Sequence, residues 1–135
     1  MENALLLDTN AVSVLLKESA VHASRKVALD NILRGKFGFI SFITVAELLF
    51  WAEKRQWGQT KREALDIKIR SFGILDPTRD TADFWAHTRT ECEASGKILQ
   101  PHDLWIAASA LEHELPLVSA DIAFDAVPGL RRIPF

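Results

Sequence analysis

The sequence predicts a single α/β domain with a mostly parallel sheet and helices on both of its faces. Its 135 residues are near the commonest size of one domain, and no repeat or Pro/Ser-rich linker divides them. Short apolar segments alternate with longer segments of helical pattern, which is typical of βαβ units. Right-handed crossovers in such units place helices on both faces of the sheet. We therefore assign residues 1–135 to one domain.

The first half of the chain contains two predicted strands, each followed by helix. The polar residues 8–10 mark the start of a helix directly after the first apolar run. Gly35 ends the next helix, since glycine accepts the backbone conformation of a helix stop. Gly58 separates the two helices that come after the second strand. In chain order the predicted elements are strand Ala4–Leu7, helix Val21–Leu33, strand Phe37–Ser41, and helices Thr44–Trp57 and Thr60–Arg70.

The second half repeats the alternation of strand and helix. Residues 76–77, Asp-Pro, stop the third strand, and Gly96 lies near the end of the helix that follows. The predicted elements are strand Phe72–Leu75, helices Thr81–Ala94 and Pro101–Glu114, and strand Pro116–Val118, with Leu130–Ile133 as a candidate fifth strand.

Composition restricts the class of protein and the chemistry open to it. Hydrophobic residues make up 48% and charged residues 25% of the chain, the balance of a soluble globular protein. No apolar run approaches the roughly 18 residues that cross a bilayer, and the N-terminus lacks the pattern of a signal peptide, so we expect a cytoplasmic protein without a membrane partner. The single cysteine, Cys92, excludes an internal disulfide and a thiolate zinc site.

Charge is unevenly distributed along the chain. The net charge is −2, but the segment from Arg34 to Arg70 holds eight basic and four acidic residues. A locally basic face on an acidic protein suits a nuclease, because it attracts phosphates while carboxylates elsewhere hold a cation. A solvated helical hairpin with ion pairs is the structural alternative.

Four acidic residues fall where a ligand site is expected. Ligands of parallel α/β sheets bind beyond the carboxyl ends of the strands. Asp8 directly follows the first strand, and Glu47 lies six residues after the second, in the first turn of its predicted helix. Asp103 opens the helix before the fourth strand, and Asp121 follows that strand by three residues. Clustered carboxylates need a neutralising cation, and hard oxygen ligands favour magnesium or manganese.

Each acid also has a structural interpretation. Thr44 and Glu47 fit a capping box, and Asp103 sits where an acid complements a helix dipole. Asp8 and Asp121 both stand where a side chain caps a helix start. The sequence leaves both interpretations open for each acid, although the shared position of the four favours a ligand site.

Four blocks of sequence carry a resemblance to a known family. They are residues 5–10 (LLLDTN), 44–48 (TVAEL), 101–111 (PHDLWIAASAL) and 117–121 (LVSAD). In order and spacing they resemble the motifs of PIN domains, and in particular VapC-type toxins of bacterial toxin–antitoxin modules. The resemblance spans nearly the whole chain. It implies a PIN-like α/β/α sandwich with a five-stranded sheet, magnesium-dependent RNA endonuclease activity, and neutralisation by a small cognate antitoxin protein.

By motif, the resemblance assigns Asp8, Glu47, Asp103 and Asp121 as the catalytic acids. Asp8, Asp103 and Asp121 are the expected ligands of Mg²⁺, with Mn²⁺ as a second candidate. Thr9 and Ser119 are expected to support the acids by hydrogen bonds. The last block departs from the family pattern, since many relatives have an acid at the position of Ala123. Asp125, which follows Phe124, is the candidate to compensate for that missing acid.

Three other functions and two protein partners are also compatible with the sequence. The same acids would serve a phosphatase or a DNA-directed nuclease, and as helix caps they would suit a catalytically silent binding module. Several apolar residues on helices near the active-site end are hard to bury all at once: Val12, Val14, Leu15, Phe50, Trp51 and Trp57. Trp51 and Trp57 are candidate anchors for the antitoxin, with a basic antitoxin residue reaching the acids in place of metal. A homodimer is the other expected assembly, and these residues would alternatively complete its interface or the domain core.

Overall fold

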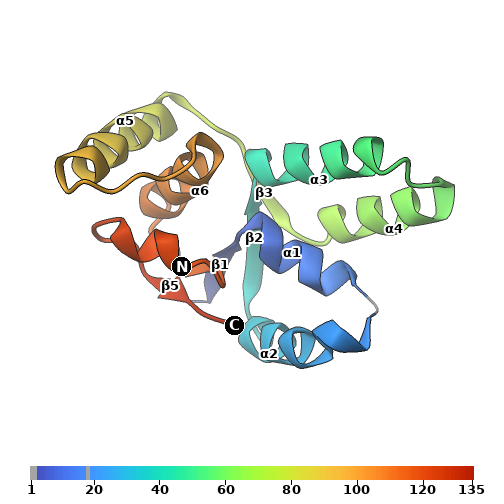
Figure 1. Ribbon diagram of the computed structural model, residues 1–135. Coiled ribbons are helices and arrows are strands. Elements are labelled where there is room, and N and C mark those ends of the chain that lie inside the picture. Colours follow the sequence, from blue (N-terminus) through green and yellow to red (C-terminus); the bar gives the residue numbers. More distant parts are fainter. Residues whose placement is uncertain (1–2, 18) are drawn as a thin grey trace.

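The computed structural model describes residues 3–17 and 19–135, which form a five-stranded sheet between two layers of helices (Figure 1). The strands are β1 (Ala4–Leu7), β2 (Phe37–Ser41), β3 (Gly73–Leu75), β4 (Leu117–Val118) and β5 (Arg132–Ile133). Their order across the sheet is β3-β2-β1-β4-β5, and all four pairings are parallel. The predicted fold class and all five predicted strands are confirmed, with shifts of one or two residues at their ends.

The predicted helices are also present. They are α1 (Thr9–Leu16), α2 (Ala23–Leu33), α3 (Phe42–Lys54), α4 (Gln59–Arg70), α5 (Arg79–Ala94) and α6 (Pro101–Glu112), with short 3-10 helices at Ala20–His22 and Ile122–Ala126. Within the described residues, no helix has both the length and the apolar character needed to cross a bilayer.

The central strand β1 contributes side chains to the hydrophobic cores on both faces of the sheet. Successive side chains of a strand point to opposite faces, so its four apolar residues supply both cores. Leu5 and Leu7 pack with residues of α1, α2, α3 and α4 on one face. Ala4 and Leu6 pack with residues of α5 and α6 on the other. Figure 1 shows the two groups of helices on opposite sides of the strands.

The start of α3 differs from the prediction. Ser41 is the N-cap, and its Oγ accepts a hydrogen bond of 3.1 Å from the backbone N–H of Ile43. The helix therefore begins at Phe42, two residues earlier than predicted, and Thr44 is a fully buried residue inside it. Glu47 lies in the second turn rather than the first. The capping-box interpretation of Thr44 and Glu47 is wrong, because a serine at the end of β2 caps the helix instead.

The strand order places a topological switch point at the centre of the sheet. From β1 the chain moves outward through β2 and β3, and it returns to the other side of β1 to form β4 and β5. The loops that leave β1 and β4 therefore diverge at neighbouring strand ends. In parallel α/β proteins, ligands bind in the crevice at this point.

Candidate active site

Asp8 is the most buried acid at the switch point, with 4% of its surface exposed. It is the N-cap of α1, and its Oδ1 accepts a hydrogen bond of 2.8 Å from the N–H of Ala11. Its Oδ2 accepts a hydrogen bond of 2.5 Å from the hydroxyl of Ser119, the residue after β4. The capping interpretation is thus correct for Asp8, and it does not exclude a role at the site, because the cap orients the carboxylate.

Glu47, in α3, is held by the hydroxyl group of Thr9 at the start of α1. The Thr9 hydroxyl donates to Glu47 Oε1 at 2.7 Å, and Thr9 and Thr44 share a hydrogen bond of 3.0 Å. Both threonines are buried, so this network fixes the carboxylate relative to α1 and α3. The supporting roles predicted for Thr9 and Ser119 are both seen in the hydrogen bonds.

Asp103 and Asp121 complete the acidic group from the α6 side. Asp103 lies in the first turn of α6, and Asp121 is the N-cap of the 3-10 helix after β4. Asp121 Oδ1 accepts a hydrogen bond of 2.9 Å from the N–H of Ala123, so it also has a capping role. His102 Nε2 lies 3.7 Å from Asp103 Oδ1 and 4.0 Å from Glu47 Oε2, which makes it the nearest basic side chain to both.

The four acids line one cavity of about 230 Å³. Thr9, Asn10, His102, Trp51 and Ile106 contribute the rest of its lining. Every acid predicted from the sequence therefore lies at this cavity, although the four come from separate stretches of the chain. The convergence of the strand ends brings them together.

Burial and the negative charge of neighbouring acids raise the pKa values of Asp8 and Asp103. Burial raises the pKa of Asp8 from 3.8 to about 6, against the lowering effect of the hydrogen bonds from Ser119 and Ala11, and the charges of Asp103 and Asp121 raise it further. The pKa of Asp103 is also raised, chiefly by burial, while His102 lowers it and Asp121 and Glu47 raise it. A cation in the cavity would oppose both effects by favouring the ionised carboxylates.

The donor set fits a hard divalent cation held partly through water. Within residues 3–17 and 19–135, no group of three or more Asp, Glu, His or Cys side chains is close enough together to hold a metal ion directly. Magnesium retains several waters and needs only one or two carboxylates, so an open acidic cavity without thiolates suits it. Asp8, Asp103 and Asp121 are the residues available to such an ion.

Asp125 does not replace the missing acid of the last block. It accepts two hydrogen bonds from Arg132, at 2.8 and 3.0 Å, and is not part of the cavity lining. Arg132 lowers the pKa of Asp125. Arg132 Nη1 also donates to the carbonyl of Ser119 at 3.0 Å, so the pair ties β5 to the loop that carries Asp121. The sequence pattern contained no signal for this pairing.

The sequence predicted only part of the environment of Trp51. Besides the acidic cavity, it lines a larger cavity of about 580 Å³ between α1, α3 and α4. The sequence indicates a partly exposed aromatic residue near the active-site end, but it does not place this ring against the acids. Trp57 lines the larger cavity but not the acidic one.

Together, the strand order and the site define a parallel α/β protein with a carboxylate-lined cavity at the switch point of its sheet. The sequence matches the PIN domain family over residues 5–130, and the chain belongs to that family. It is 31% identical over 127 residues to Ribonuclease VapC2 of Haemophilus influenzae, with 93% of each chain covered.

Solved structures agree with this assignment. A chain of VapBC2 from Rickettsia felis, in a crystal structure bound to a DNA fragment from the promoter, superposes with a TM-score of 0.84 at 26% identity. The match covers 97% of this chain and 98% of that one. A chain of DNA-bound VapBC from Salmonella typhimurium superposes with a TM-score of 0.81 at 26% identity, with 97% of each chain covered. The resemblance to VapC-type proteins noted in the sequence is confirmed.

Proposed function

We propose that this protein is a magnesium-dependent endoribonuclease that a cognate antitoxin neutralises. The observation that carries the proposal is the convergence of Asp8, Glu47, Asp103 and Asp121 on one cavity, with the pKa values of Asp8 and Asp103 raised. Names of relatives support the substrate class, among them the tRNA(fMet)-specific endonuclease VapC of Shigella flexneri, which is 28% identical over 127 residues. Manganese, with the same hard-ligand preference, is the alternative ion.

Each cavity residue has a distinct part in this chemistry. Asp8, Asp103 and Asp121 would hold the ion, which when bound would lower the pKa of a water and neutralise charge on the phosphate oxygens. Glu47 is oriented through Oε1 by Thr9, so its Oε2 is available to position the attacking water and accept its proton. His102 offers a hydrogen-bond donor to a phosphate oxygen at the mouth of the cavity.

The test is cleavage of single-stranded RNA by the purified protein in magnesium, in manganese and in EDTA. We expect cleavage with either metal, none in EDTA, and none with Asp103→Asn. Asp30→Asn, which alters an exposed acid on α2, is the matched control and should cleave normally. Cleavage of a DNA strand or a phosphate monoester instead of RNA would favour the nuclease or phosphatase alternative. No turnover of any substrate would favour a binding module.

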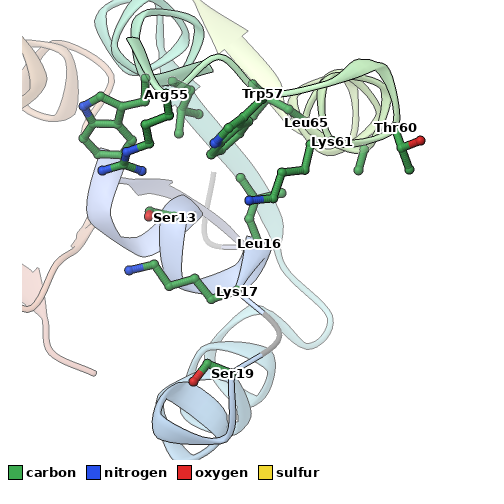
Figure 2. Close-up of a pocket in the computed structure, with 12 residues that line it drawn as sticks. Ser13, Leu16, Lys17, Ser19, Arg55, Trp57, Thr60, Lys61 and Leu65 are labelled. Carbon is green, nitrogen blue, oxygen red and sulfur yellow. The ribbon is translucent and has the colours of Figure 1, made fainter. Parts of the chain in front are cut away.

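The antitoxin is proposed to occupy the cavity between α1, α3 and α4, shown in Figure 2. Leu16, Leu65 and Trp57 give it an apolar floor, while Lys17, Arg55 and Lys61 surround it with positive charge. This chemistry fits an apolar antitoxin segment flanked by acidic residues. Because Trp51 borders both cavities, a segment seated there could bring a basic residue to the acids in place of metal. Solved relatives include VapBC complexes, which supports a partner of this kind.

The homodimer stays a prediction, and the outer face of α3 is the surface we propose for it. Phe42, Leu49 and Phe50 expose 49%, 50% and 58% of their surface there. A two-fold interface pairs a patch with its own copy, and these three apolar side chains can pack against their copies. Analytical ultracentrifugation should give a dimer for the wild type and a monomer for Leu49→Arg. Equal masses for both would exclude this face.

A further inference from the structure

Trp51 separates two cavities of opposite chemistry. On one side lies the acidic cavity, and on the other the larger cavity with Lys17, Arg55 and Lys61 at its edge. Trp51 is half-buried, and it packs against the larger core cluster. The fold therefore holds this side chain in place, while it still contributes to the lining of both cavities.

Among the described side chains that line the acidic cavity, only Trp51 and Ile106 are apolar. Ile106 is 1% exposed, so it offers almost no contact surface. A polar cavity built around carboxylates thus has one accessible aromatic face. Nothing in the acid chemistry itself requires that face, which leaves its role beside the acids unexplained by the proposed hydrolysis.

Arg55 makes a cation–π contact with the Trp51 ring. Its guanidinium carbon lies 5.3 Å from the Trp51 ring centroid, within the range of a cation–π contact. Arg55 lines the larger cavity and not the acidic one. Arg55 therefore contributes its charge to the larger cavity, and it takes no part in the lining of the acidic one.

We propose that Trp51 stacks a nucleobase next to the cleaved phosphate, and that Arg55 binds the neighbouring phosphate of the same strand. This inference rests on the proposed ribonuclease function and names how the site holds its substrate. Single-stranded nucleic acids are bound by aromatic rings that stack bases and by cations that follow the backbone. Trp51, in α3, and Arg55, the C-cap of that helix, provide both.

A nucleobase suits the Trp51 side of the acidic cavity because it is uncharged and has a π face. Asp8, Asp103 and Asp121 would repel an anionic group placed there. A phosphate beyond the base would reach Arg55 on the far side of the ring. A strand laid in this way would pass from the acids over Trp51 toward the basic cavity.

The experiment compares binding of two probes in EDTA, so that it does not depend on cleavage. One probe is a short oligouridylate, and the other is a ribose–phosphate chain of equal length without bases. For Trp51→Leu we expect roughly tenfold weaker affinity for the oligouridylate by fluorescence anisotropy, about 1.4 kcal/mol, and unchanged affinity for the chain without bases. Trp51→Phe, which keeps an aromatic face, should retain most of the affinity. Arg55→Gln should weaken both probes and lower the salt dependence of binding.

Trp85→Leu is the matched control, because Trp85 carries the same kind of cation, Arg89, at the same distance of 5.3 Å but lines neither cavity. It should bind both probes as the wild type does. Equal losses on both probes for Trp51→Leu and Trp51→Phe, with melting temperatures like the wild type, would overturn the stacking role. So would weakened antitoxin binding with normal oligouridylate binding. Failure of wild-type cleavage in magnesium, with probe binding as expected, would instead refute the proposed function alone.

Discussion

Ser119 donates a hydrogen bond of 2.5 Å to Asp8 across 111 residues of sequence. The bond joins the ends of β1 and β4, which are neighbours in the sheet. The topological switch point lies between these two strands. The Ser119 hydroxyl also accepts a hydrogen bond of 3.0 Å from the N–H of Asp121. One buried serine therefore orients one acid directly and fixes the backbone of a second.

Substitution of Asp8 by Asn should stabilise the metal-free protein above pH 6. The Asp8 pKa is about 6 in the folded state against an ordinary value of 3.8. Its contribution to stability is therefore full below pH 3.8 and lost as the pH rises through 6. At about 1.4 kcal/mol per unit, the ionised form costs at most ~3 kcal/mol, which the uncharged amide avoids.

Urea unfolding of wild type and Asp8→Asn in EDTA at pH 4 and pH 8 checks this. The stability advantage of the variant should appear at pH 8 and shrink toward pH 4. Magnesium should raise the melting temperature of the wild type more than that of the variant. A variant less stable than the wild type at both pH values would show that the cap and the Ser119 bond outweigh the burial of charge.

Glu47→Gln should fold normally and lose most RNA cleavage. The amide oxygen can still accept the hydrogen bond from Thr9, so the α1–α3 contact survives. It lacks the negative charge and basicity that the proposed proton transfer needs. The measurement is kcat in magnesium beside the melting temperature. Ser41 caps α3, so no capping role of Glu47 complicates the result, and unchanged kcat would remove Glu47 from the catalytic set.

Ser119→Ala should move the acid limb of the pH–rate profile to higher pH. The hydroxyl bond lowers the pKa of Asp8, so its removal raises that pKa further above 6. Ionised Asp8 is the form that would bind the metal, and the variant needs a higher pH to reach it. The check is kcat/KM from pH 5 to 9. An unshifted limb with uniformly reduced activity would mean that Ser119 acts only on the backbone.

Trp57→Ala should weaken antitoxin binding by roughly 2 kcal/mol or more while sparing RNA cleavage. Trp57 lines the larger cavity, packs against the same core as Leu65, and does not reach the acids. Calorimetric measurement of antitoxin affinity tests the loss of binding, and RNA turnover of the same preparation tests whether cleavage is retained. Affinity equal to that of the wild type would place the antitoxin on another surface.

Local sequence determined most of the fold. The apolar run Ala4–Leu7 is short, flanked by polar residues and buried on both faces, and a strand of this kind belongs in the middle of a parallel sheet. Glycines and prolines marked the ends of most helices to within a few residues. The starts of α3 and α5 were each predicted two residues too late. The cap of α3 at Ser41 lay inside the predicted strand, and Thr78 rather than Thr81 caps α5.

The four acids were also found from sequence, because strand ends meet at one edge of a parallel sheet whatever their order. Only the tertiary structure decided the rest. Asp125 pairs with Arg132 and stays outside the cavity, and Trp51 separates the acids from the basic cavity. Local patterns indicate on which face of its own helix or strand a side chain lies. Which residue it contacts on that face depends on how distant segments pack. Periodicity within one segment does not encode this packing.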